Sequence, residues 1–134
     1  MAASIKVTGI ASEFANAEAD LIKTVNQLQR ASSLSAVSHL QITTPVDTGR
    51  ARGSWTMNKT GTARDTGSAN LTHVPTVSLL GPIPSNHIET IYITNGTPYI
   101  QDLNSGSSLQ SPPRFIENTL SKYFTLTAGS VKFT

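Results

Sequence analysis

The stretch that decides the fold runs from residue 92 to residue 117 and reads YITNGTPYIQDLNSGSSLQSPPRFIE. It joins a β-rich apolar run, residues 88–93, to an Asn95-Gly96 turn, a corner at Pro98, a polar Gly/Ser loop and a double proline. Asn-Gly supplies the positive φ of a tight turn, and proline fixes its own φ and steers the residue before it toward extended geometry. The stretch therefore predicts one strand, one shaped loop and the start of one helix.

Helical spacing surrounds this stretch on both sides. After the double proline, residues 113–124 predict a helix with proline at its start and one apolar stripe. Near the amino terminus, Ser12 is a cap residue and opens the longest helical pattern in the chain, which Thr44-Pro45 ends. Its first apolar stripe consists of Phe14, Ala17, Leu21, Val25 and Leu28, and its second, rotated stripe consists of Leu34, Val37 and Leu40.

The rotation between the two stripes has two interpretations. Either the helix kinks near Ser32-Ser33, or one long helix shows its first half to its own core and its second half to another subunit. We favour the second interpretation, which makes Leu34, Val37 and Leu40 subunit-interface residues.

The middle of the chain predicts short strands and one long loop. Asp47 and Gly49 suit a capped turn that leads into a strand at Trp55 and Met57. Residues 76–80 and 88–93 predict two further strands, whereas residues 58–76 form a polar loop of a length that usually marks a functional or partner-ordered segment. Residues 1–11 suit a short strand or an arm, and residues 125–134 suit a final edge strand or a tail. The 134 residues form one domain.

Composition narrows the functional class. Charged residues make up only 13% of the chain, about half the usual share, which suits a subunit among neighbours better than a free monomer. The net charge of +2 provides no electrostatic case for nucleic-acid binding, and the absence of cysteine excludes disulfides and thiolate zinc sites. No apolar run is long enough to cross a membrane or to act as a secretory signal, so we expect synthesis in the cytoplasm.

No arrangement of residues indicates an enzyme. The three histidines, His39, His73 and His87, fall on different elements, and the eight carboxylates are scattered without a marked acid and base pair. There is no nucleophile elbow and no phosphate-cradling glycine motif. We therefore expect no catalytic residues, no metal and no cofactor.

Several single residues have both a functional and a structural interpretation. Asp47 suits a turn carboxylate that meets Arg50 or Arg52 better than it suits a catalytic acid. The two arginines suit surface ion pairs better than DNA contacts. Trp55 and Tyr99 suit core positions first and interface anchors second.

Two motifs resemble a known family. Residues 44–55, TPVDTGRARGSW, resemble the signature that follows the long helix in neck and tail-completion proteins of tailed bacteriophages, and residues 92–112, YITNGTPYIQDLNSGSSLQSP, are similar to the second signature of that family. Two motifs in this order are more specific than either alone, and the resemblance spans residues 12–124. Asn104 stands where the family pattern commonly has Glu, and Ala51 stands where it has a larger apolar residue.

The resemblance implies an α+β subunit, with a long N-terminal helix and a C-terminal helix packed on a small antiparallel sheet. It implies a virion protein that forms a ring of six or twelve copies between the portal and the tail, through which the genomic DNA passes without sequence-specific binding. The expected partners are portal or adaptor proteins and tail proteins, with the loop at 58–76 docking on one of them.

The expected subunit interface is a set of residues from the long helix and the two motifs. It comprises Leu34, Val37, Leu40, Asp47, Arg50, Tyr99, Gln101, Asn104 and Gln110. Two alternative functions stay open. One is a tail terminator ring that caps the tail tube, and the other is a DNA-channel gating module with Arg50, Arg52 and Arg64 facing the channel.

Overall fold

A computed structural model describes residues 2–6, 10–46, 49–67, 73–126 and 129–133. The fold is α+β, as the sequence predicts. In chain order the elements are α1 (Ile10–Thr43), η1 (Arg52–Ser54), β1 (Trp55–Asn58), η2 (Ser78–Leu80), β2 (Tyr92–Asn95), α2 (Ile100–Asn104) and α3 (Phe115–Leu120).

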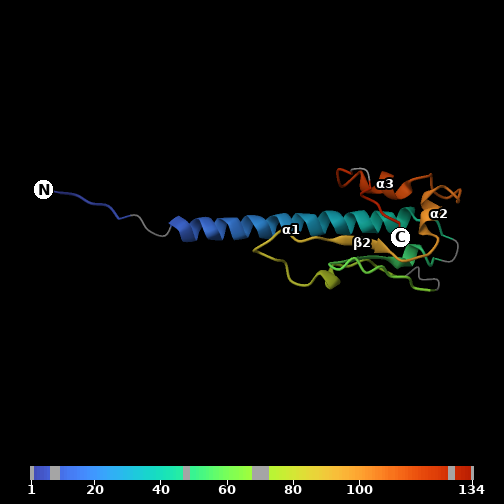
Figure 1. Ribbon diagram of the computed structural model, residues 1–134, viewed down its shortest axis with the longest axis horizontal. Coiled ribbons are helices and arrows are strands. Elements are labelled where there is room, and N and C mark those ends of the chain that lie inside the picture. Colours follow the sequence, from blue (N-terminus) through green and yellow to red (C-terminus); the bar gives the residue numbers. More distant parts are fainter. Residues whose placement is uncertain (1, 7–9, 47–48, 68–72, 127–128, 134) are drawn as a thin grey trace.

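The helix α1 is the axis of the molecule. Its 34 residues contain neither glycine nor proline, so it runs unbroken past Ser32-Ser33 and stops before Pro45. It begins two residues before the expected cap, Ser12. Figure 1 shows that the amino-terminal part of α1 projects away from the rest of the fold, which gathers around its carboxy-terminal half.

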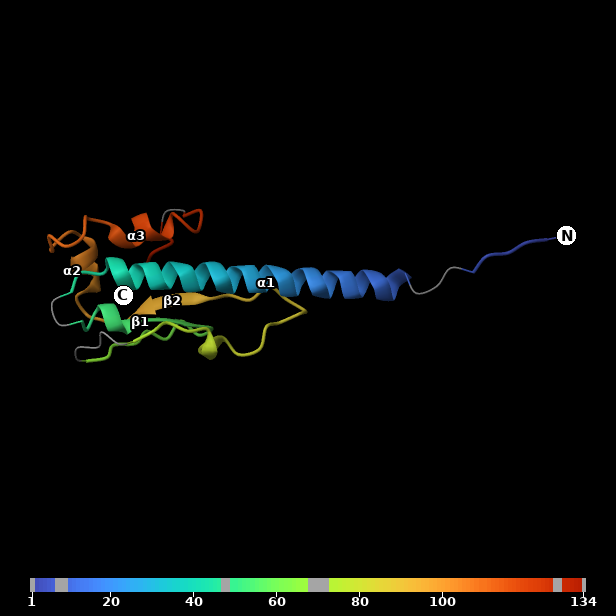
Figure 2. The same cartoon turned by 180° about the vertical axis from the view of Figure 1, so that it is seen from behind.

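A two-stranded sheet packs on that carboxy-terminal half. Strands β1 and β2 are antiparallel, with Trp55 opposite Asn95 and Met57 opposite Ile93. A two-stranded sheet is marginal alone, and here α1 and the surrounding loops cover β1, so all four β1 side chains are buried rather than alternate ones, whereas β2 stays partly exposed. Figures 1 and 2 show α3 on one side of α1 and the sheet on the other.

One apolar core joins these elements. It consists of Val37, Leu40, Ala51, Trp55, Met57, Ile100, Phe115 and Ile116. The indole Nε1 of Trp55 donates to the Thr44 hydroxyl at 2.7 Å, and that hydroxyl donates to the Leu40 carbonyl at 2.6 Å. The last turn of α1 is therefore tied to the first residue of β1 inside the core.

The predicted roles of the two stripes of α1 are wrong. Val37 and Leu40 have no exposed surface and belong to the chain's own core, and Leu34 packs against that core. Val37 and Leu40 therefore cannot form a subunit interface while the chain is folded, whereas Leu34 is only partly buried. The first stripe is the exposed one, because the short sheet and the short helices cover only the second half of α1.

Four other predicted elements differ from the structure, of which the helix predicted at 113–124 is shorter than expected, since α3 covers only Phe115–Leu120. The strand at 76–80 is wrong, since residues 78–80 form the short 3-10 helix η2. The strand predicted at 88–93 starts only at Tyr92, because side chains of α1 take the backbone hydrogen bonds of Glu89. The polar loop after Pro98 contains a helix, α2, which the sequence pattern did not reveal.

The positive φ predicted for the Asn95-Gly96 turn does not occur at Gly96, whereas Gly49 has a φ of 87°. Glycine at position 96 is required by close packing instead. A Cβ there would lie 2.7 Å from the carbonyl carbon and oxygen of Arg64, and the Gly96 amide donates to that oxygen at 2.6 Å. The absence of a side chain thus lets the loop at 61–65 lie against the end of β2.

The two ends of the chain differ. Residues 2–6 have no regular structure and are exposed. Residues 129–133 also form no strand, but Val131 and Phe133 pack against the core. The carboxy-terminal segment is therefore part of the fold at these positions.

Candidate assembly surface

The projecting half of α1 carries an apolar stripe with no cover. Phe14 is 71% exposed, Leu21 and Leu28 are each 64% exposed, and Val25 is 37% exposed. Their three-, four- and seven-residue spacing places them on one face of the helix. Large apolar side chains gathered on one exposed face are typical of a surface that binds another protein. We call this set the α1 stripe.

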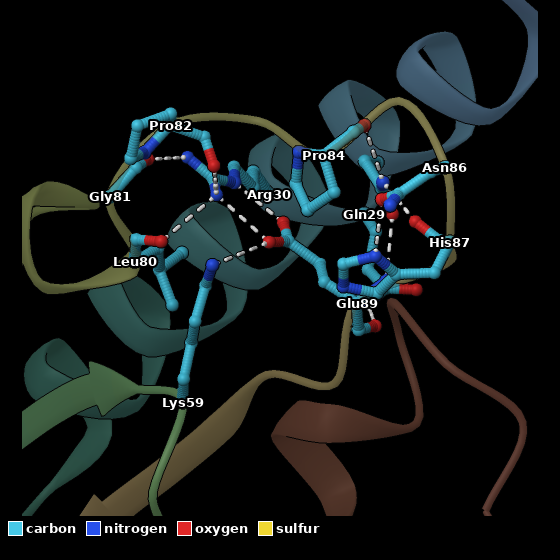
Figure 3. Close-up of polar contacts among 11 residues, drawn as sticks. Gln29, Arg30, Lys59, Leu80, Gly81, Pro82, Pro84, Asn86, His87 and Glu89 are labelled. Carbon is cyan, nitrogen blue, oxygen red and sulfur yellow. Dashed lines mark hydrogen bonds and ion pairs between the residues drawn. The ribbon is translucent and has the colours of Figure 1, made fainter. Parts of the chain in front are cut away.

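The end of the stripe, at Val25 and Leu28, overlaps along the helix with a polar cluster that begins at Asn26. Gln29 and Arg30 of α1 hold the segment 80–89, as Figure 3 shows, and Asn26 bonds to the same segment. The Asn26 amide donates to the carbonyls of Pro84 at 3.1 Å and His87 at 2.9 Å, and it accepts from the Glu89 amide at 3.0 Å. We call these contacts the polar clasp. It replaces strand pairing as the anchor of the segment before β2.

A buried ion pair lies at the centre of the polar clasp. Arg30 donates to both carboxylate oxygens of Glu89, at 2.5 and 2.8 Å, and the exposed fractions of the two side chains are 9% and 2%. Its remaining donors reach the carbonyls of residues 80–82. The hydrogen bonds from Arg30 lower the pKa of Glu89, and the same contact raises the pKa of Arg30. Both groups are therefore charged at neutral pH, and Lys59 lies 3.8 Å from the carboxylate.

A second ion pair fastens the long loop to the turn before β1. Arg50 donates to the two oxygens of Asp65 at 2.9 and 2.5 Å, and its guanidinium carbon lies 5.6 Å from the centre of the Tyr99 ring. In the described part of the loop at 58–76, the only residue in a helix or strand is Asn58, the last residue of β1. The pair connects this loop to both sequence motifs.

The pKa of Asp65 is a direct test of that arrangement. The hydrogen bonds from Arg50, and then that from the Gly67 amide, lower the pKa of Asp65 to about 2. We expect carboxyl-carbon NMR titration to find this low pKa, and we expect Arg50→Gln to return it toward the ordinary value of about 3.9. A pKa of Asp65 that is already ordinary in the unmodified chain would contradict the contact.

The other two predicted channel arginines also contact their own chain. Arg52 donates to the carbonyls of Ile42 and Thr44 at 3.1 Å and so caps the carboxy-terminal end of α1. Arg64 is exposed and lies 3.2 Å from Nδ1 of His73. The other ring nitrogen of His73 donates to the Trp55 carbonyl, so Nδ1 is the acceptor for Arg64.

A hollow of about 380 Å³ lies between the end of α1 and α3. Its lining includes Ile42, Pro45, Arg52, Pro112, Phe115 and Lys122. Ile42 is 70% exposed, and Lys122 is exposed too. Within the described ranges, no carboxylate lies within ion-pair distance of either cation. The hollow is therefore mixed in character: it has four apolar side chains and two cations, and its other lining residues, Thr43, Thr44, Gln110, Ser111, Asn118 and Thr119, are polar and uncharged.

Two of the predicted interface residues are used inside the chain. Asn104 is buried, so its assignment to a subunit interface is wrong: Nδ2 donates to both oxygens of Glu117, and Oδ1 accepts from the Ile116 amide at 2.9 Å. Gln110 exchanges two hydrogen bonds of 2.7 Å with the backbone of Val46. These bonds join the two sequence motifs, and Gln110 itself stays exposed.

The remaining predicted interface residues are distributed as follows. Tyr99 is half-buried under Arg50, and Gln101 is exposed on α2. Asp47 lies outside the described residues. No group of three metal-ligating side chains occurs within the ranges that the structure describes. None of the helices there combines the length and apolar character that a membrane crossing requires.

Comparisons with protein-family models, with curated proteins and with solved structures find no match to this chain. The likeness to neck and tail-completion proteins therefore rests on the two sequence motifs.

Proposed function

We propose that this chain is a structural subunit of the neck of a tailed bacteriophage, in a ring between the portal and the tail. The observation that carries the proposal is the α1 stripe, because a helix with four exposed large apolar side chains is a poor surface for a free monomer. The two sequence motifs and the α+β architecture support the choice of family. The low share of charged residues agrees with a surface largely covered in an assembly.

The test measures assembly by mass photometry, for the protein alone and mixed with the portal and tail-tube proteins of the same phage. We expect a six- or twelve-fold ring, alone or only in the mixture. Leu28→Ser should abolish the ring because it places a hydroxyl in the apolar stripe. Leu79→Ser is the matched control, since Leu79 is also 64% exposed but lies on η2. A wild-type protein that stays monomeric and joins neither partner would remove the proposal.

A further inference from the structure

We infer that the α1 stripe of one copy docks into the hollow beside Arg52 and Lys122 of the next copy, so that copies join head to tail. This inference rests on the proposed ring and names the two surfaces that build it. The occupant of the hollow is thus a second copy of this chain.

The positions of the two surfaces set the geometry of the contact. The α1 stripe lies on the projecting half of α1, and the hollow adjoins residues 42–45 at the opposite end of the same helix. A surface at one end that binds a different surface at the other end is a heterologous contact. Such contacts leave one free surface of each kind, so they continue into a ring where the rotation between copies closes and into an open filament where it does not.

Charge on the two surfaces is complementary. Residues 10–29 carry three carboxylates, Glu13, Glu18 and Asp20, and one lysine. Residues 30–134 carry eight basic and five acidic side chains, and Arg52 and Lys122 stand at the hollow. An acidic helix is therefore attracted to the positive wall of the hollow, in addition to the burial of apolar surface.

The same charges disfavour pairing of two α1 stripes with each other. Phe14, Leu21 and Leu28 repeat every seven residues, so Glu13 and Asp20 flank one side of the seam and Glu18 flanks the other. Parallel pairing places Glu13 against Glu18 of the second copy, and antiparallel pairing centred on the stripe places Asp20 against its own counterpart. A symmetric dimer through α1 therefore brings carboxylates together.

The hollow can also contact a helix that carries both apolar side chains and carboxylates. Ile42 and two prolines supply apolar contact, whereas Arg52 supplies a guanidinium whose Nε, buried in the wall, finds no acceptor among the described residues. Docking of an acidic helix places negative charge beside this guanidinium, which otherwise has only backbone carbonyls as partners.

The experiment uses two full-length variants that each lose one surface. The stripe variant is Leu21→Ser with Leu28→Ser, and the hollow variant is Ile42→Ser with Lys122→Glu. We expect each alone to be monomeric, with self-association weakened about 100-fold or more. A one-to-one mixture should give a dimer and nothing larger, because only the intact stripe of the hollow variant and the intact hollow of the stripe variant can join. Circular dichroism checks that both variants are folded.

Control variants and salt complete the test. Leu79→Ser and Lys132→Glu should assemble as the wild type does, and raising the salt concentration should weaken assembly. Rings that form equally well from either variant would overturn the docking inference and the role of the α1 stripe in assembly, whereas the ring itself would still support a neck subunit. A mixture that stays monomeric while the wild type assembles would also overturn it. Wild-type protein that assembles under no condition, with or without portal and tail-tube proteins, would overturn both.

Discussion

Glu89→Ala is expected to destabilise the chain by about 3–5 kcal/mol, measured by chemical denaturation at pH 7. The substitution leaves the buried guanidinium of Arg30 without its carboxylate, although three backbone carbonyls still accept from it. An unpaired buried charge is more costly than the loss of the pair itself. Residues 80–89 should become exchangeable in hydrogen-exchange measurements before the core around Trp55 does.

A double-mutant cycle measures the interaction energy between Arg30 and Glu89 separately from their contacts with other groups. Arg30→Leu with Glu89→Leu should recover part of the stability lost by either single substitution, because no charge is left buried. Asp65→Asn is the control for an exposed pair, and its effect on the free energy of unfolding should be much smaller. An effect of Glu89→Ala no larger than that of Asp65→Asn would contradict the importance of the polar clasp.

The Arg30–Glu89 ion pair makes the free energy of unfolding depend on pH. Because Arg30 lowers the pKa of Glu89 below the unfolded value of 4.5, the folded chain binds fewer protons than the unfolded chain in that range. The stabilising contribution of Glu89 is therefore complete above the unfolded pKa and is lost as the pH falls through the folded pKa. The loss of stability between about pH 5 and pH 2 should be smaller in Glu89→Ala than in the wild type.

Asn104→Asp is expected to cost about 2–3 kcal/mol at pH 7, although the two side chains have the same shape. Asn104 donates from Nδ2 to both oxygens of Glu117, at 3.2 and 2.9 Å, and its backbone carbonyl accepts from the Arg114 amide at 2.5 Å. An aspartate there replaces the donor by an acceptor and sets two carboxylates against each other. The junction of α2 with α3 should loosen, as thermal unfolding would report.

The charge explanation has its own test. Carboxylates in contact raise the pKa of one of them, so the stability lost by Asn104→Asp should return as the pH falls below that raised pKa. Glu117→Gln added to Asn104→Asp should restore most of the stability at pH 7, because an amide can again donate across the contact. A loss that is equal at pH 4 and pH 7 would show that shape rather than charge sets the cost.

The sequence predicted the architecture because its strongest patterns are local. A run of 34 residues without glycine or proline and with helical spacing of its apolar residues favours one long helix, and Trp55 with Met57 marks a strand that becomes buried. The beginning of β2 and the nature of residues 76–80 depended on long-range contacts. The amide of Glu89 bonds to Asn26, 63 residues earlier, and no local pattern reveals that competition.

The inner face of α1 differs from the predicted one for a different reason. Asn26, Arg30 and Ser33 are all buried, and with Val37 and Leu40 they form one continuous face at spacings of three and four residues. A search for apolar periodicity sees only the last part of this face, and it takes the exposed stripe at Phe14 to Leu28 for the inward side. Buried polar residues on a helix are detected only through their partners, and here these lie in an irregular segment.

At the candidate site, too, local patterns identified the residues but did not reveal their long-range contacts. Arg50, Arg52 and Tyr99 were identified from the motifs, but their contacts with Asp65, with the end of α1 and with each other required the fold. Asn104 was placed at an interface by analogy, whereas its buried amide joins two helices of its own chain.

The unbroken length of α1 has a mechanical consequence. At 1.5 Å per residue the helix is about 50 Å long, and it contains no glycine or proline at which it could hinge. A force applied to its outer turns is therefore transmitted as in a stiff strut, first to the hydrogen bonds at Asn26 and Arg30 and then to the packed turns at Val37 and Leu40. The outer tip and the far end of this strut must move together.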